Sequence, residues 1–450
     1  MLKKLSIGVL VTLLFLVLGL NYVGITPAYI IYGPGVASGI ASKLLCSARY
    51  VSGYSDQLAF DDLVQYSPIL SQVTTSYDDS ARSVTANLFG LSDTTARYIP
   101  GLGCAVDYDS QQGREQLVAR QAGKSKAAWP AGSGVDTINQ AFQAAVDGVL
   151  QRDNASGLNT RALLVVHRGQ VVAEAYAQEA TPDMPLLGWS MAKSLTAVML
   201  GNLEMRGLID LRGKPGFEKW QADERSTIGI EHMLTMTDGL RFSETYEPGD
   251  DATAMLFTSP SSAGYVLGKP LRHEPGAVFN YSSGTANLLA RLYVDTLGSP
   301  QRSYDDFMQF IYEPAGFQNA VFETDASGVW VGSSYFYASA RDWARLGQLM
   351  LQGGVINGHR IVAREWVERA TSPNGSANEK AYGYQWWLNR GDEQLRFPDL
   401  PQDAYFANGN RQQILMVIPS RQAVIVRLGW TAGGYPTNDN FSGLLEQLPR

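Results

Sequence analysis

Apolar residues recur along the chain with strand-like and helical spacings, and these spacings predict where strands and helices lie. Runs at 162–166 and 171–176 flank a turn and predict a β-hairpin. A shorter run predicts a strand at 83–91. Apolar residues at helical spacing predict a helix at 135–150, with Asp136 near its start.

The second half of the chain changes character twice. Positions 208 to about 372 carry mostly helical and loop patterns. Strand patterns then return at 383–389, 405–408, 414–418 and 423–428, before a last helix predicted at 440–448. We therefore predict an α/β body of the α+β kind, in which an antiparallel sheet is flanked by helices and interrupted by an all-helical insertion.

The first apolar run is of a different kind. It extends almost unbroken over 7–23 and follows Lys3 and Lys4. No further charged residue occurs before Lys43. It is long for the core of a signal peptide and no Ala-x-Ala site follows it directly, so we favour a retained membrane anchor over a cleaved signal. Residues 1–30 are therefore predicted to be an N-terminal signal or anchor, with the lysines on the cytoplasmic side.

Two cysteines, Cys46 and Cys104, make up the whole cysteine content. An oxidising compartment would let them form a disulfide, and two free buried thiols are the alternative. No cluster of His, Cys or carboxylate residues has the spacing of metal ligands, so no metal site is predicted. We expect 31–125 to form an N-terminal extension holding these cysteines and 126–450 to form the main domain, with a linker-like stretch near 124–134.

Composition excludes some functions. The chain of 450 residues is 45% hydrophobic, which is ordinary for a globular protein and argues against global disorder. Its net charge is −7 and no basic block lies beyond the N-terminus, so nucleic acid is not a predicted partner.

The most informative chemical pattern is Ser190-Met-Ala-Lys193, at the start of a strongly apolar run that stops at Gly207. Positions i and i+3 share a helix face, so the Ser190 hydroxyl and the Lys193 amine can meet. An amine in an apolar site loses affinity for protons and can activate the serine as a nucleophile. Taken alone, the pattern is equally compatible with a buried helix that happens to begin with serine.

A serine–lysine pair also needs a proton relay, and Tyr281-Ser-Ser283 is the best candidate. It precedes a run of helical character at 284–294. The Tyr-x-Ser spacing alone does not decide the matter, because it recurs at Tyr50, Tyr108 and Tyr337.

Four segments in this order resemble the serine β-lactamase superfamily: Ser190–Lys193, 230–239, Tyr281–Ser283 and 338–347. Within it, the chain looks most like 6-aminohexanoate-dimer hydrolases, beside family VIII esterases and class C β-lactamases. The resemblance covers roughly 135–450 and implies a β-lactamase/transpeptidase-like fold. Together with the N-terminal run, it implies a bacterial protein with its hydrolase domain in the periplasm, anchored in the inner membrane or exported.

The resemblance also implies roles. Ser190 would be acylated, and Lys193 and Tyr281 would pass its proton to the leaving group before water releases the acyl group. Either a partly neutral Lys193 or a Tyr281 phenolate could act as the base. Trp189, Ser283 and Asn408 are candidate substrate-binding residues, and no cofactor is implied.

The third family motif, Lys-Thr-Gly, is absent. Its nearest counterpart is Asn408-Gly409-Asn410, just before the strand predicted at 414–418. Gly409 would let substrate lie against the strand edge, and the N–H groups of Ser190 and Asn410 would form the oxyanion hole. Because the lysine that usually pairs with a penicillin carboxylate is missing, we expect an ester or linear amide as the small-molecule substrate.

Three other functions remain in view. A non-catalytic, penicillin-binding-like envelope module would keep the fold without turnover, although the presence of Ser190, Lys193 and Tyr281 argues against it. The predicted location is compatible with a D-alanyl carboxypeptidase or a β-lactamase, but the absence of the third-motif lysine argues against both. A histidine triad and a zinc protease are disfavoured, because there is no Gly-x-Ser-x-Gly elbow and no zinc-binding helix motif.

Overall fold

A six-stranded antiparallel sheet forms the centre of the main domain in the computed structural model, which describes residues 26–108, 113–120, 123–136, 138–390 and 394–448. Its strands, in spatial order, are β12 (Trp387–Leu388), β13 (Tyr405–Gly409), β14 (Gln413–Ile418), β15 (Ala423–Gly429), β5 (Thr160–His167) and β6 (Gln170–Tyr176). Every residue of β5, β14 and β15 is buried, because helices cover both faces of the sheet.

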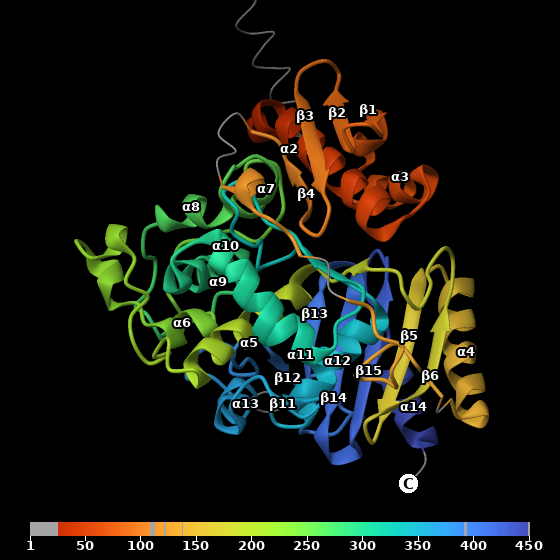
Figure 1. Cartoon of the computed structure of the whole chain (residues 1–450). Coiled ribbons are helices and arrows are strands. Elements are labelled where there is room, and N and C mark those ends of the chain that lie inside the picture. The colour runs from red at the N-terminus through yellow and green to blue at the C-terminus, as the bar shows by residue number, and fades with distance from the viewer. Residues whose placement is uncertain (1–25, 109–112, 121–122, 137, 391–393, 449–450) are drawn as a thin grey trace, which may run out of the picture.

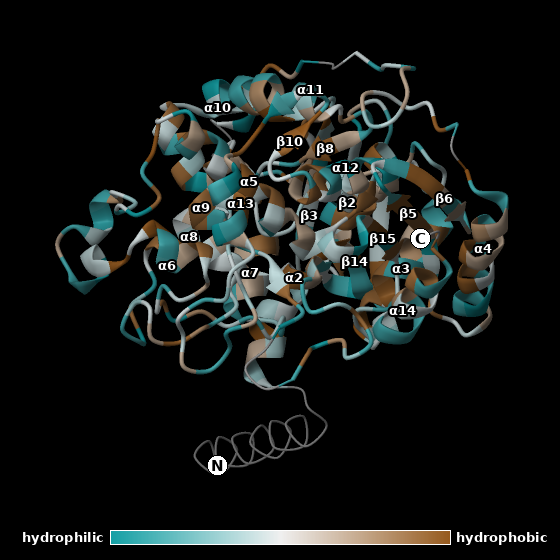
Figure 2. Cartoon of the chain, turned by 90° about the horizontal axis from the view of Figure 1, so that it is seen from below, coloured by the Kyte–Doolittle hydropathy of each residue, from teal (hydrophilic) through white to brown (hydrophobic). Residues whose placement is uncertain are grey.

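Helices α4 (Gln140–Ala155) and α14 (Thr437–Gln447) cover one face of this sheet, and α12 (Ala340–Leu351) covers the other (Figure 1). Helix α5 (Ala192–Met205) is buried from Ala192 to Leu203 and packs against α9 (Ser283–Leu297). Viewed from below, hydrophobic residues gather between the layers, while α4 and α14 carry hydrophilic residues outward (Figure 2).

A helical region packs around α5. It contains α6 (Ile230–Leu234), α7 (Asp251–Phe257), α8 (Ser262–Leu267), α9 (Ser283–Leu297), α10 (Pro300–Phe307), α11 (Glu313–Ala315) and α13 (Arg364–Ala370). Short strands accompany it: β7 (Leu186–Leu187), β8 (Ala320–Phe322), β9 (Phe336–Ala338), β10 (Val355–Ile356) and β11 (His359–Arg360). The predicted α+β body with an antiparallel sheet and flanking helices is confirmed, but the predicted all-helical insertion is wrong, because β8, β9, β10 and β11 lie within it.

The N-terminal extension has its own sheet and lies on top of the main domain in Figure 1. It consists of α2 (Pro27–Ser47), α3 (Asp56–Val64), β1 (Val73–Asp78), β2 (Ser83–Leu88), β3 (Asp93–Ile99) and β4 (Gly103–Val106). The predicted Cys46–Cys104 disulfide is confirmed and joins α2 to β4. Buried Lys43 of α2 forms an ion pair with Glu323, which is 0% exposed, so the extension is also held by charge.

The predicted strand at 383–389 is wrong in its extent, since only Trp387–Leu388 pair as β12. Gln385 has a left-handed φ of +59°, which turns the chain, and its side-chain amide donates to the carbonyls of Met233 and Leu234. A tertiary hydrogen bond has here overridden the local strand pattern.

The apolar run at 7–23 lies outside the described residues, so the predicted anchor is not visible. No helix in the described part of the chain is long and apolar enough to cross a membrane. The predicted divisions at residues 30 and 125 stay predictions, and α2 begins at Pro27.

Candidate active site

Ser190 lies in a short 3-10 turn, Trp189–Met191, directly before α5. This turn is packed closely against the end of β13. A Cβ atom on Gly409 would stand 2.1 Å from the Gly188 carbonyl oxygen, so no larger residue could occupy position 409 without moving the turn. The close approach brings the end of β13, which carries the proposed counterpart of the third motif, beside the serine.

Lys193 points at Ser190 from the first turn of α5. Its Nζ is 2.9 Å from Ser190 Oγ, 3.0 Å from Ser283 Oγ and 3.0 Å from the Ser333 carbonyl oxygen. The side chain is only 1% exposed, and this burial lowers the pKa of Lys193 to about 8, against an opposing effect of the Glu244 carboxylate. With this pKa, roughly a tenth of the amine is neutral at pH 7 and about half at pH 8, and the neutral form can accept the Ser190 proton.

Tyr281 faces the same two groups. Lys193 Nζ is 4.8 Å from the centre of its ring, and the ring stacks on Trp387 at 5.5 Å. Burial raises the pKa of Tyr281, while a hydrogen-bonding interaction with Ser190 opposes the rise. Tyr281 is therefore a neutral phenol that can donate a proton.

Ser283 is fully buried and links Lys193 to a carboxylate. Its hydroxyl donates to Glu244, and its backbone N–H donates to Glu244 Oε2 at 2.8 Å. The Tyr246 hydroxyl donates to Glu244 Oε1 at 2.9 Å. These contacts favour a relay role for Ser283 over the predicted contact with substrate.

Glu244 and Tyr246 were missed by sequence reasoning. They lie in the loop between α6 and α7, where the Phe-Ser-Glu-Thr-Tyr segment has no periodicity and no recognisable spacing to Ser190. Their proximity to Ser283 arises only when α9 packs against this loop.

The turn that follows β13 is fixed by a buried arginine. Arg427 is 0% exposed and donates to the carbonyls of Arg411, at 3.2 Å, and Gln412, at 2.9 Å. Asn408 and Asn410 are exposed at the end of this strand, whereas Gly409 is buried. The Asn408 side chain lies on the same face of the sheet as Phe406 and Ile414, opposite the face on which Gly409 meets Gly188, and the predicted roles of Asn408 and Asn410 toward substrate stay predictions.

Two other candidates lie away from the reacting groups. Trp189 is 3% exposed and packs between Tyr66 and Tyr335, a placement that favours a supporting role over contact with substrate. Tyr337, an alternative match to the Tyr-x-Ser pattern, is buried on β9 near Lys43 of the extension. Tyr281 is therefore the match that lies beside Ser190 and Lys193.

The groups brought together are a hydroxyl, a partly neutral amine, a phenol and a strand edge, which suit nucleophilic acyl transfer. Within the residues that the structure describes, no three His, Cys, Asp or Glu side chains gather in a way that could hold a metal ion.

Comparison with known proteins identifies the family of this chain. Residues 138–440 match the sequence model of the family described as Beta-lactamase. The 6-aminohexanoate-dimer hydrolase of Paenarthrobacter ureafaciens is 27% identical over 297 residues, which are 60% of this chain and 72% of that protein.

Solved structures share the fold. EstCE1, described as a hydrolase with promiscuous acyltransferase activity, superposes with a TM-score of 0.57 at 14% identity, over 68% of this chain and 98% of its own. A class C β-lactamase superposes with a TM-score of 0.53 at 13% identity, over 70% and 99% of the two chains.

Proposed function

Because the chain belongs to the beta-lactamase family of hydrolases, we propose that it cleaves an ester or a linear amide through an acyl-enzyme on Ser190. The observation that carries this proposal is the 2.9 Å contact between Ser190 Oγ and Lys193 Nζ, with the pKa of Lys193 lowered to about 8. Burial raises the pKa of Tyr281 but lowers that of Lys193, and this favours the lysine over a tyrosine phenolate as the base.

The proposed acylation proceeds in two steps. Neutral Lys193 takes the Ser190 proton as Oγ bonds to the substrate carbonyl carbon, and the N–H groups of Ser190 and Asn410 hold the resulting oxyanion. The intermediate then collapses and breaks the bond to the leaving alcohol or amine. Tyr281 gives that leaving group a proton and regains one from Lys193. Water then cleaves the acyl-enzyme through the same groups and restores the Ser190 hydroxyl.

The substrate class is proposed from the strand edge. Asn408-Gly409-Asn410 supplies hydrogen-bonding groups but lacks the lysine of the third family motif, which would pair with a penicillin carboxylate. The names of the relatives, an amide hydrolase and a hydrolase with acyltransferase activity, fit acyl substrates of this kind.

A substrate panel tests this assignment. It would contain a short-chain p-nitrophenyl ester, a linear 6-aminohexanoate amide, a D-alanyl-D-alanine peptide and a chromogenic cephalosporin. We expect kcat/KM for the ester or the linear amide to exceed that for the cephalosporin by about 10²-fold. Preferred turnover of the cephalosporin or the peptide would instead support a β-lactamase or carboxypeptidase. Turnover of none would support the non-catalytic module.

Replacing Tyr281 by phenylalanine should lower kcat by about 10²-fold, in the range for a lost general acid–base group. The matched control is Tyr337→Phe, since Tyr337 has the same sequence pattern but is buried on β9. Steady-state kinetics on the ester checks both variants. Full activity in Tyr281→Phe with a large loss in Tyr337→Phe would show that the relay is wrongly assigned.

Glu244→Gln should move the pH midpoint of acylation to lower pH. The Glu244 carboxylate raises the pKa of Lys193, so removing its charge makes the amine less basic. We expect the plateau rate to change by less than about 10-fold, because no contact joins Glu244 to Ser190. Glu247→Gln is the control, because Glu247 is exposed on the same loop and accepts a hydrogen bond from the Tyr29 hydroxyl. A midpoint that stays in place or rises contradicts the coupling.

We also propose that the protein acts outside the cytoplasm, at or beyond the inner membrane of a bacterium. The apolar run at 7–23 and the Cys46–Cys104 disulfide support this location. Fractionation of cells that express the full chain tests it, and recovery in the cytosolic fraction with both thiols free to alkylation would refute it.

A further inference from the structure

Tyr66 of the N-terminal extension packs against the turn that carries Ser190. Its ring packs edge-on against the rings of Trp189 and Trp430. The distances between ring centres are 6.1 Å and 5.7 Å, respectively. The Arg411 guanidinium lies 4.1 Å from the centre of the Tyr66 ring. We call Tyr66, Trp189, Arg411 and Trp430 the Tyr66 cluster. It joins the extension to three separate segments of the main domain.

Two members of the Tyr66 cluster adjoin the proposed oxyanion donors. Trp189 directly precedes Ser190, and Arg411 directly follows Asn410. Trp189 has a φ of +47° and Arg411 a φ of +60°. For residues with side chains, such conformations cost about 1–3 kcal/mol each and persist only where the surroundings enforce them. Packing of both side chains against Tyr66 supplies part of that enforcement.

Arg411 is a buried cation without a carboxylate partner. Among the described residues, no acidic side chain forms an ion pair with Arg411. Its Nε atom is buried and has no hydrogen-bond partner among them. Its neighbours are the faces of Tyr66 and Trp430, the latter at 5.9 Å. This positive charge, which directly follows Asn410 in the chain and is partly offset by the nearby Asp62 carboxylate, favours negative charge on a substrate oxygen.

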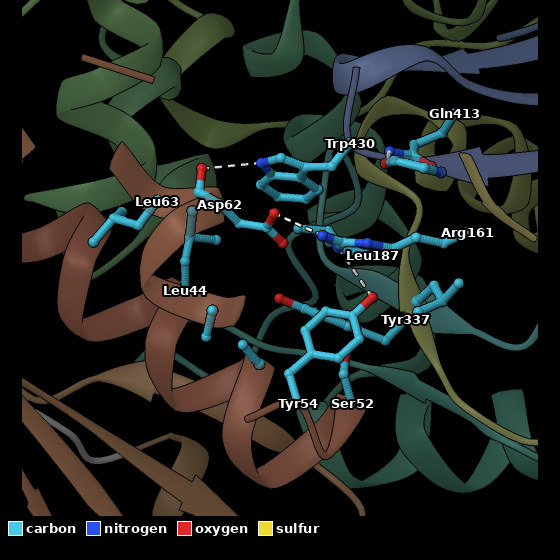
Figure 3. A pocket seen from close by; sticks show the side chains of 14 residues that line it. Leu44, Ser52, Tyr54, Asp62, Leu63, Arg161, Leu187, Tyr337, Gln413 and Trp430 are labelled. Carbon is cyan, nitrogen blue, oxygen red and sulfur yellow. Dashed lines mark hydrogen bonds and ion pairs between the residues drawn. The ribbon is translucent and has the colours of Figure 1, made fainter. Parts of the chain in front are cut away.

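Polar contacts hold the extension in the position in which Tyr66 packs against Trp189 and Trp430. The Trp430 indole N–H donates to the Asp62 carbonyl oxygen at 2.9 Å, and Arg161 pairs with the Asp62 carboxylate at 2.6 Å (Figure 3). Arg161 also donates to the Tyr54 hydroxyl at 3.2 Å. The cavity left at this boundary measures about 40 Å³, room for little more than one water molecule. The extension is therefore packed directly against Trp430.

We infer that the extension completes the acyl-transfer site, with Tyr66 as a positioning residue that holds the Ser190 turn and Arg411 for oxyanion stabilisation. This inference rests on the proposed function. The family match begins at residue 138, so the cluster combines a residue outside the matched region with three inside it. The buried Tyr66 hydroxyl interacts weakly with Arg411 and Trp189 but forms no well-aligned hydrogen bond with a described residue, so the ring makes the main packing contacts.

Three variants of the full-length chain test the inference. Tyr66→Leu should lower kcat on a short-chain ester by about 10- to 100-fold with little change in KM, the scale expected when reacting groups are slightly misplaced. Tyr66→Phe should stay within about 3-fold of the parent, because it keeps the ring. Tyr98→Leu is the control, since Tyr98 stacks on Tyr50 within the extension and has no contact with Ser190.

A second readout separates positioning from simple packing. A short alkyl boronic acid forms a tetrahedral anion with an active serine, so its affinity should fall in Tyr66→Leu by the same factor as kcat. Arg411→Gln should lower both quantities by about 10-fold and serves as the test if Tyr66→Leu does not fold.

Wild-type kcat and boronate affinity in Tyr66→Leu or, where that variant is unfolded, in Arg411→Gln would overturn the inference. So would equal losses in Tyr66→Leu and Tyr98→Leu. Absence of both turnover and boronate binding in the parent chain is a different result, because it refutes the proposed function itself.

Discussion

Replacing Ser190 by alanine is expected to abolish ester turnover, with a loss in kcat of about 10⁴-fold or more. The variant keeps the Lys193 amine and the strand edge but has no oxygen to form the acyl bond. Hydrolysis rates on a short-chain ester, measured at an enzyme concentration high enough to detect any remaining activity, check this expectation.

The control for Ser190→Ala is Ser194→Ala, one turn further along α5. Ser194 is as buried as its neighbours, and its hydroxyl donates to the Gln385 carbonyl at 2.6 Å, away from Lys193. This variant loses a buried hydrogen bond, worth about 1 kcal/mol of stability, and should keep the activity of the parent. If Ser190→Ala retained turnover, the nucleophile would lie elsewhere.

Replacing Lys193 by alanine should lower kcat/KM by about 10³-fold or more, because Ser190 then has no base. In the parent, the amine must be neutral to accept a proton, and burial lowers its pKa to about 8. Acylation should therefore fall as the pH drops through about 8 and level off above it. The pH dependence of kcat/KM on the ester, from pH 6 to 9.5, measures this directly.

Lys193→Arg provides the matching control. It keeps the positive charge, but a guanidinium does not deprotonate in this range, so the variant should be as inactive as Lys193→Ala at every pH. A pH profile that is flat from 6 to 9, or substantial activity in Lys193→Arg, would contradict the role of the lysine as base.

The parts of the site that sequence could predict are those set by local geometry. The i, i+3 spacing of Ser190 and Lys193 fixes their contact as soon as a helix forms there, and Gly207 ends that helix with a left-handed φ of +72°. The 162–166 and 171–176 runs predicted the β5–β6 hairpin, whose turn is short enough to be determined locally.

The parts that could not be predicted depend on distant segments. Gly409 meets Gly188 across more than two hundred residues, and no periodicity encodes that contact. Glu244 reaches Ser283 only through packing of a loop on α9, and Tyr66 reaches Trp189 only through docking of the extension. The strand predicted at 383–389 was shortened for the same reason, since the Gln385 side chain bonds to a distant backbone.

The intact mass of the protein after brief exposure to an activated short-chain ester tests the central claim most directly. The account predicts one acyl adduct on the parent chain and none on Ser190→Ala, with the parent adduct decaying as water releases the acyl group. An adduct of equal yield on Ser190→Ala, or no adduct and no turnover in the parent, would contradict an acyl-enzyme on Ser190.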